Sequence, residues 1–444
     1  MTMTRHEGYF KWHGWSECCV LALCTVFSAA VLSADASEGA GASSLSSSSS
    51  PLPLSPPYRF DDLLMAGVEG NVRIASGRSG VEAAEQLRNA AWQSYLPTPA
   101  VQVDSDQEGG SEIVLSLQQP LWAGGRIDAG VDAASANAES AIAAVSEEQY
   151  TLALSIIDYF GRYVQSRARQ ETLHRFNQRL MMYQTRMIHR VKFGASPEND
   201  LALLEARVAT TAERLKSVQA DGQVALTQLS QLTNLSLDSQ SIVFDFDPVM
   251  PPAVEEVVSR ARQYNPTLNR LTHDIASAEA SVRAQRAVMM PNVSLVLAHN
   301  IYHGTNQLND DTSVGIRIQM QPGAGLSAYS NTQAAVAQLQ SLRFKREATE
   351  QELLANIRST HENLVSAISR QADTKLNAQA AANVLSSYER LFIAGKRSWL
   401  DVMNAARDLS DADIAVADNE AEQLGLRYRI DLYAAKYAWM KKAQ

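Results

Sequence analysis

The sequence presents one arrangement of landmarks twice, and this duplication constrains the fold more than any single motif does. Asn71 precedes the first proline of YLPTPAVQV by the same number of residues as Asn265 precedes the proline of MMPNVSLVL. Further along, Gly194 in VKFGASPENDL corresponds to Gly395 in FIAGKRSWLDV. The number of residues between Gly194 and Gly395 is larger than the number between the two corresponding prolines, Pro97 and Pro291. We therefore interpret the chain as an internal duplication with one main length change.

Each half is predicted to contain the same elements in the same order. A moderate helix is expected first, followed by two strands joined by a polar loop, and then by two long helices that meet at the glycine. The predicted repeats cover residues 58–248 and 249–440, with first helices at about 61–94 and 254–288, strands at about 99–120 and 291–322, and helical hairpins at about 123–237 and 325–440.

The long helices are predicted from the spacing of apolar residues and from the absence of proline. Between Gly124 and Lys192 the apolar residues recur in steps of three, four and seven, which is coiled-coil spacing, and the stretch from Leu326 to Phe392 behaves similarly. At about 1.5 Å per residue, each helix would run on the order of 100 Å. That length is typical of a rod or a tunnel and not of a compact enzyme.

The strand segments alternate between apolar and polar residues, which places one set on each face of a sheet. In the second half, the apolar positions are Val314, Ile316, Ile318 and Met320, and the positions between them are Gly315, Arg317 and Gln319. A barrel wall that is apolar toward lipid and polar toward a lumen satisfies this pattern without a covering layer, whereas a half-buried strand of a soluble protein has the same alternation. Four strands are too few to close a barrel, so closure requires several chains.

The loops between the strands, VDSDQEGGSE and HGTNQLNDDT, are polar and are expected to be exposed. His299 and His303 lie four apart beside the second loop, a spacing that on a helix would suggest a metal pair. In a strand they fall on one face but too far apart to share an ion easily. We therefore predict neither a metal site nor a cofactor.

Residues 1–36 are predicted to be a signal peptide, because Arg5 and Lys11 precede an apolar run and Ala34-Asp35-Ala36 offers a small-x-small cleavage pattern. A short N-terminal anchor is the alternative. Lipidation of Cys24 is disfavoured, since the bulky Leu23 precedes it. All three cysteines lie within this segment, which fits an exported protein without disulfides.

Residues 37–57 form a Ser/Pro-rich linker that cannot bury a core. The formal net charge of the chain is −9, which argues against binding to nucleic acid and against a general attraction to anionic membrane surfaces. The sequence shows no Ser/His/Asp set, no paired catalytic carboxylates and no His/Cys cluster with usable spacing. We therefore do not expect an enzyme.

The segment AGKRSWLDVMNA, residues 394–405, contains a Gly-Lys pair that suggests a phosphate-binding loop. The spacing excludes this, because the earlier glycine that a Walker loop requires is an arginine, and Lys396 is followed by Arg397 and not by serine or threonine. A turn between two helices fits better. Gly395 permits a left-handed backbone where a helix ends, and Ser398 can cap the helix that follows.

The turn of the first repeat is predicted to form in the same way, with Ser196 as the cap and Pro197 at the first helical position. Asp200 and Asp401 occupy matching positions after the two glycines, and Asn404 falls on the same helix face as Asp401. In a single chain these acids are expected to be solvated first-turn residues that complement the helix dipole. In a ring of chains they would face one another around an axis.

This order of elements, given twice, resembles the outer-membrane efflux family typified by TolC. AGKRSWLDVMNA is similar to that family's glycine-plus-DV helical tip, and the likeness covers about residues 58–438. The resemblance implies a mainly α homotrimer with a twelve-stranded β-barrel in lipid of the outer membrane and an α-helical tunnel through the periplasm. It also implies a constricted periplasmic entrance that is opened by a periplasmic adaptor protein and an inner-membrane ABC transporter.

The resemblance assigns roles to residues of the two tips. Asp401 matches an acidic site of the entrance, and Asn404 stands where a second acid can occur. Arg397 matches a basic residue that holds neighbouring tips closed by bonding across to the first repeat, where Asp200 is the matching acid. Phe392 stands where an aromatic hydroxyl can occur, which leaves a hydroxyl-mediated latch open to question. The tip residues implied to turn the chain and contact the adaptor are Gly194, Ser196, Gly395, Lys396 and Ser398.

Within the family, RSWLDV together with QPGAGLSA is similar to the branch that serves type I secretion, including export of very large adhesins. Efflux of small molecules through the same kind of duct is the neighbouring hypothesis. A soluble periplasmic coiled-coil scaffold is a third, and it would need the alternating segments to be covered internally.

Overall fold

A computed structural model of the protein describes residues 56–105, 111–246, 250–303 and 308–441. The predicted signal peptide, nearly all of the predicted linker and parts of both strand-connecting loops lie outside these residues. The described residues form one compact unit, so the two repeats pack together and do not make separate bodies.

The first helix of each repeat is broken at an asparagine. The helices are α2 (Phe60–Gly70) and α3 (Val72–Gln93) in the first repeat, and α6 (Val254–Tyr264) and α7 (Pro266–Ala287) in the second. The prediction of one continuous helix over 61–94 and over 254–288 is therefore wrong. Asn71 and Asn265 have extended backbones, and their side chains accept hydrogen bonds from Arg73 N and Leu268 N. Each asparagine satisfies a free N–H group at the start of the next helix, which ends the preceding one.

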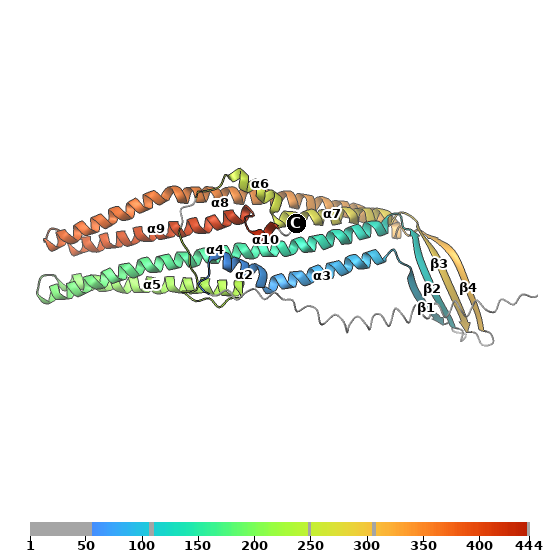
Figure 1. The fold of residues 1–444 in the computed structure, drawn as a ribbon, viewed down its shortest axis with the longest axis horizontal. Helices are drawn as coiled ribbons and strands as arrows, with labels where there is room; N and C mark the ends of the chain where they lie inside the picture. Colours follow the sequence, from blue (N-terminus) through green and yellow to red (C-terminus); the bar gives the residue numbers. More distant parts are fainter. Residues whose placement is uncertain (1–55, 106–110, 247–249, 304–307, 442–444) are drawn as a thin grey trace, which may run out of the picture. The chain divides into compact units, whose positions relative to one another are not determined.

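The four strands form one antiparallel sheet in the order β1-β2-β3-β4 (Figure 1). The strands are β1 (Thr98–Ser105), β2 (Ser111–Trp122), β3 (Asn292–His303) and β4 (Leu308–Gln319). The β2–β3 pair joins the two repeats, with Leu117 opposite Leu297. The apolar set predicted in β4 is exposed, at 68%, 68% and 70% for Val314, Ile316 and Ile318. The predicted alternation is thus present, and its apolar side is uncovered in the single chain.

The two hairpins are α4 (Arg126–Lys192) with α5 (Glu198–Thr233), and α8 (Ser327–Ile393) with α9 (Trp399–Tyr433). A one-turn helix, η1 (Ala324–Leu326), precedes α8, and a short helix, α10 (Ala438–Lys441), follows α9. Helices α4 and α8 both have 67 residues, or about 100 Å at 1.5 Å per residue. Helix α4 packs against α5, α7 and α9, so the two hairpins lie side by side (Figure 1). Among the described helices, none is both long enough and apolar enough to cross a bilayer.

The hairpins enclose two separate apolar clusters. The central core includes Ile156, Phe160 and Val164 of α4, Leu229 of α5, Leu364 of α8 and Leu424 of α9. The tip core lies next to the two turns and includes Leu180 and Met187 of α4, Leu204 of α5, Leu385 of α8, and Trp399 and Val402 of α9. Because burial of apolar surface is the main driving force for helix packing, these two clusters hold each hairpin to its neighbour.

Candidate gate at the hairpin tips

Both long helices end in the same turn. Gly194 and Gly395 have φ values of +69° and +70°, in the left-handed region that glycine adopts without strain. Each turn has the two backbone hydrogen bonds of a Schellman motif. They are Gly194 N to Val191 O (2.9 Å) and Ala195 N to Arg190 O (2.7 Å) in the first tip, and Gly395 N to Phe392 O (3.0 Å) and Lys396 N to Leu391 O (2.8 Å) in the second. The predicted role of the two glycines as chain-turning residues is confirmed.

Ser398 begins α9 with a capping box. Its Oγ accepts a hydrogen bond from Asp401 N at 3.2 Å, and Asp401 Oδ2 accepts bonds from Ser398 N at 3.1 Å and Ser398 Oγ at 2.9 Å. These bonds, with a smaller contribution from nearby Arg397, hold the pKa of the Asp401 carboxyl below its usual range. The charge on Asp401 is therefore fixed at neutral pH, and within one chain it acts as a first-turn acid.

The first tip lacks the predicted cap. Pro197 itself is the N-cap of α5, with extended backbone angles, and the first helical residue is Glu198. The prediction that Ser196 caps α5, with Pro197 inside the helix, is wrong. Ser196 Oγ instead accepts a hydrogen bond from Arg190 Nε at 3.0 Å, and Arg190 also bonds Ala195 O at 3.1 Å. An arginine in the last turn of α4 thus competes for the hydroxyl and holds the turn from the other side.

The proposed latch residues have different partners within one chain. Arg397 Nη1 lies 3.9 Å from Asp401 Oδ2. The guanidinium carbon of Arg397 lies over the ring of Tyr388, 4.5 Å from the ring centroid. Asp200 is half-buried, and desolvation raises its pKa while Arg190 opposes the shift. No ion pair joins Arg397 to Asp200 in the described part of a single chain. The contact that the resemblance implies is one between neighbouring copies.

An aromatic cluster joins the two tips. Trp399 packs edge-on against Tyr183 of α4, with ring centroids 5.5 Å apart, and at 5.1 Å against Phe392. Tyr183 donates a hydrogen bond to Glu389, and Arg190 lies over the Phe392 ring at 4.8 Å. Burial is the main cause of the raised pKa of Tyr183, so the phenol stays neutral and keeps donating. These side chains line a hollow of about 260 Å³ between the hairpins.

Sequence reasoning identified Phe392 but missed the remainder of this cluster. Tyr183 lies far from the tip motif in the sequence, and no periodicity distinguishes it from other residues of the α4 seam. Trp399, within the motif RSWLDV, could have indicated this cluster, because a large aromatic side chain directly after a helix cap gains stability by packing into a neighbouring element. Of the other predicted residues, Lys396 is exposed and Asn404 is half-buried on α9.

The described residues contain no group of three or more His, Cys, Asp or Glu side chains that could hold a metal ion. His299 shares a hydrogen bond with Thr312 of the neighbouring strand, at 2.8 Å between Nδ1 and Oγ1. The side chain of His303 lies outside the described residues.

Comparison with known proteins finds a family model, two relatives and solved structures that are similar to this chain. Residues 257–435 match the family model for outer membrane efflux proteins. The outer membrane efflux protein BepC of Brucella suis is 22% identical over 393 residues, which is 83% of each protein. The alkaline protease secretion protein AprF of Pseudomonas aeruginosa is 23% identical over 246 residues, 52% of this chain and about half (50%) of AprF. Among solved structures, the outer membrane protein VceC of Vibrio cholerae has a TM-score of 0.73 at 16% identity, covering 84% of this chain and 95% of VceC.

The four-stranded sheet and the two long helical hairpins form the fold of VceC, and the similarity extends over nearly all of that protein. The expected fold class is confirmed. The family model, BepC and the fold shared with VceC together support the resemblance to the outer membrane efflux proteins. BepC and VceC are outer membrane proteins by name, and the match of residues 257–435 to the efflux family fits the prediction of a channel in that membrane without catalytic activity.

Proposed function

We propose that the protein is the outer-membrane duct of a tripartite export system and that it works as a homotrimer. The observation that carries this proposal is the sheet, because β1 and β4 each have a strand on one side only and the apolar face of β4 is exposed. Free strand edges and uncovered apolar side chains are unstable alone. Closure of three such sheets into one ring pairs every edge and turns Val314, Ile316 and Ile318 toward lipid.

The helices support the same assembly. Large apolar side chains are exposed on α3 and α8 in the single chain; they include Val72, Leu87, Trp92, Tyr329 and Phe344. Contact between copies would cover these side chains and place the four long helices of each chain in the wall of a periplasmic tunnel. An interface of this kind stabilises an obligate oligomer, since it resembles a domain core divided between chains.

The tips form the periplasmic entrance in this proposal. The Asp401 carboxylates of three copies make an acidic ring, with Asn404 beside each. Arg397 of one copy latches to Asp200 of the next when the entrance is closed. Residues of the two tips contact a periplasmic adaptor, which couples the duct to an inner-membrane ABC transporter; these residues are Gly194, Ser196, Gly395, Lys396 and Ser398.

We propose protein as the cargo, delivered by type I secretion and including large adhesins. This is supported by the similarity to AprF, a secretion protein by name, and by the motifs RSWLDV and QPGAGLSA. Efflux of small molecules is the second candidate, and the longer match to BepC favours it. Supernatant proteomics and toxicity tests on a deletion strain distinguish the two. Loss of a secreted protein supports secretion, and sensitivity to small toxic compounds with an unchanged set of secreted proteins supports efflux.

The acidic ring is tested in planar bilayers with purified wild-type and variant protein. Asp401→Asn removes the charge but keeps a side-chain oxygen for the capping box, so it isolates electrostatics from helix capping. We expect weaker block by divalent cations and reduced cation selectivity, because removal of a focused negative potential lowers local cation concentration. Asp408→Asn, at an exposed acid beyond the tip, is the matched control. Unchanged selectivity in Asp401→Asn would refute the ring.

The latch and the duct itself have separate tests. Arg397→Ala should raise the leak conductance of the closed channel, and a conductance equal to wild type counts against the latch. Cell fractionation tests the duct as a whole. Recovery of the protein as a soluble periplasmic monomer rejects the duct in favour of a coiled-coil scaffold.

A further inference from the structure

The central core and the tip core are separated by a stretch of the hairpins that buries almost no large apolar side chain. We call this stretch the polar belt; it consists of residues 165–175 of α4, 209–222 of α5, 369–380 of α8 and 410–420 of α9. The buried residues of the belt are Ser166, Thr172, Leu173, Thr211, Gly222, Ser410, Ala412, Ala417 and Asn419. Leu173 is the one large apolar member of this set.

A hollow of about 530 Å³ lies along the belt and across into the tip core. Thr172 and Arg175 of α4, Lys375 of α8 and Asp413 of α9 are among the residues that line it. The hollow is open to solvent and is lined largely by polar and charged side chains, so few apolar contacts join the helices across it. The helices are therefore held less firmly in the belt than in either core.

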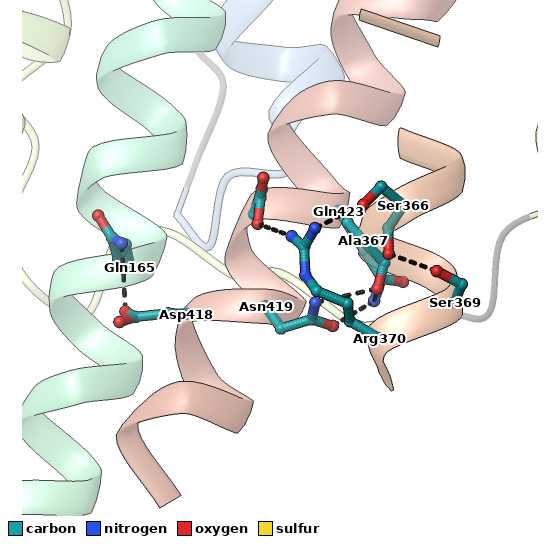
Figure 2. A network of polar contacts seen from close by, with 9 residues as sticks. Gln165, Ser366, Ala367, Ser369, Arg370, Asp418, Asn419 and Gln423 are labelled. Atoms are coloured by element: carbon teal, nitrogen blue, oxygen red, sulfur yellow. Dashed lines mark hydrogen bonds and ion pairs between the residues drawn. The ribbon is translucent and has the colours of Figure 1, made fainter. Parts of the chain in front are cut away.

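An ion pair crosses from α4 to α9 at the end of the belt nearest the central core. Arg169 binds Asp418 through two hydrogen bonds, from Nε at 2.6 Å and from Nη2 at 2.8 Å. Gln165 donates a third bond to the same carboxylate at 3.1 Å (Figure 2). Bidentate pairs of this kind are strong and fix the geometry of both partners. This contact ties the first hairpin to the second.

Buried amides join α9 to α8 on the next turn. Asn419 and Gln423 both donate to the backbone oxygen of Ala367, at 2.9 and 3.2 Å, and Gln423 also donates to Asn419 Oδ1 at 2.6 Å (Figure 2). Both amides are less than 10% exposed. A slip of one residue along a helix moves a side chain by about 1.5 Å and would break these bonds. Buried polar contacts of this type are known to specify helix register.

We propose that the polar belt is the level at which the tip half of each hairpin tilts, and that the clamp formed by Arg169, Asp418, Asn419 and Gln423 holds the helices in register during the tilt. Few apolar contacts must break for the helices to change their angle at the belt. The directional bonds of the clamp oppose sliding. Asp401 and Arg397 move together, because both lie at the tip of the second hairpin, and the distance between the two tips changes as the hairpins tilt. This inference rests on the proposed function, since a duct with a closed entrance must move its tips.

Spin-label distances test the hinge directly. The sequence has no cysteine after Cys24, so introduced pairs are the labelled sites of the mature chain. The tip pair, at Lys192 and Lys396, lies on the side of the belt that carries the two turns. The second pair, called the upper pair, lies on the other side, at Thr151 and Gln351. All four positions are exposed. Labelled full-length protein is assembled with excess unlabelled protein, so that distances within one copy are measured. We expect a broad distance distribution for the tip pair and a narrow one for the upper pair.

Arg169→Gln removes the ion pair of the clamp. Asp418→Asn also removes it, with a smaller change in side-chain size. Either variant should broaden the tip-pair distribution about two-fold and leave the upper pair unchanged, because local stability falls on one side of the clamp only. Arg370→Gln is the matched control, since it removes the exposed Arg370–Glu422 pair at the same level.

The hinge is refuted if both clamp variants leave the tip pair unchanged, or if they broaden both pairs alike. Single-channel conductance is measured on the same samples. Absence of conductance with the expected distances would overturn the proposed function and leave the hinge intact.

Discussion

Gly222 offers a sharp test of how α4 and α5 pack. It lies in the interior of α5, and a Cβ built on it would be 2.4 Å from Ser166 Oγ of α4. Ser166 is buried, and its hydroxyl donates to Val218 O at 2.7 Å. Gly222→Ala should therefore force the Ser166 side chain to rotate or the two helices to separate.

Three contributions decide whether Gly222→Ala raises or lowers the stability of the protein. Alanine is favoured over glycine in a helix by about 1 kcal/mol. Against this, loss of a buried hydrogen bond costs about 1–3 kcal/mol and overpacking costs about 1–3 kcal/mol. We expect a net destabilisation of about 1–5 kcal/mol. The apparent unfolding temperature of the purified full-length protein, followed by circular dichroism, measures it.

Two further variants make the test specific. Gly425→Ala in α9 is the matched control, because a Cβ there meets nothing within 4 Å; it should be neutral or stabilising. Ser166→Ala combined with Gly222→Ala should recover part of the loss, since the colliding hydroxyl is absent. A Gly222→Ala protein as stable as Gly425→Ala would refute the close approach of the two helices.

Two other predictions concern helix ends. Ser398→Ala should cost about 1 kcal/mol of stability through loss of the cap. The same variant should raise the pKa of Asp401, because the bonds that lower it are lost. In the wild type, the stability that this carboxylate contributes is present above its unfolded pKa of about 3.9 and is lost as pH falls through the lower folded pKa. The variant should therefore lose this stability at a higher pH than the wild type, which thermal unfolding across that pH range measures. Ala435→Gly should stabilise the end of α9 by up to about 1 kcal/mol, because Ala435 has a φ of +47°; a lower unfolding temperature contradicts this.

Much of the fold could be predicted from local sequence patterns. The predicted helices beginning at Gly124 and Leu326 correspond to α4 and α8, which begin two and one residues later. The strand positions were recognisable from alternation, and the turns at Gly194 and Gly395 from glycine itself. These features depend on residues close together in the chain, so the sequence carries them directly.

The misplaced features depend on competition between neighbours. Asn71 and Asn265 were used as landmarks of the duplication but were not recognised as breaks, because an asparagine can lie within a helix or cap the next one. Ser196 is a good cap by residue type. Its hydroxyl is bound by Arg190, however, and a cap preference does not reveal such a competitor.

The sequence alone determined the duplication, the long helices, the alternating strands and the two glycine turns, because each follows from backbone preference or from a short period. Only the tertiary structure decided which side chains meet across the hairpins. Trp399 against Tyr183, Arg169 with Asp418, and the amides on Ala367 all join residues far apart in the chain. The rotation and axial position of each helix place these contacts, and both are set by the packing of the whole bundle.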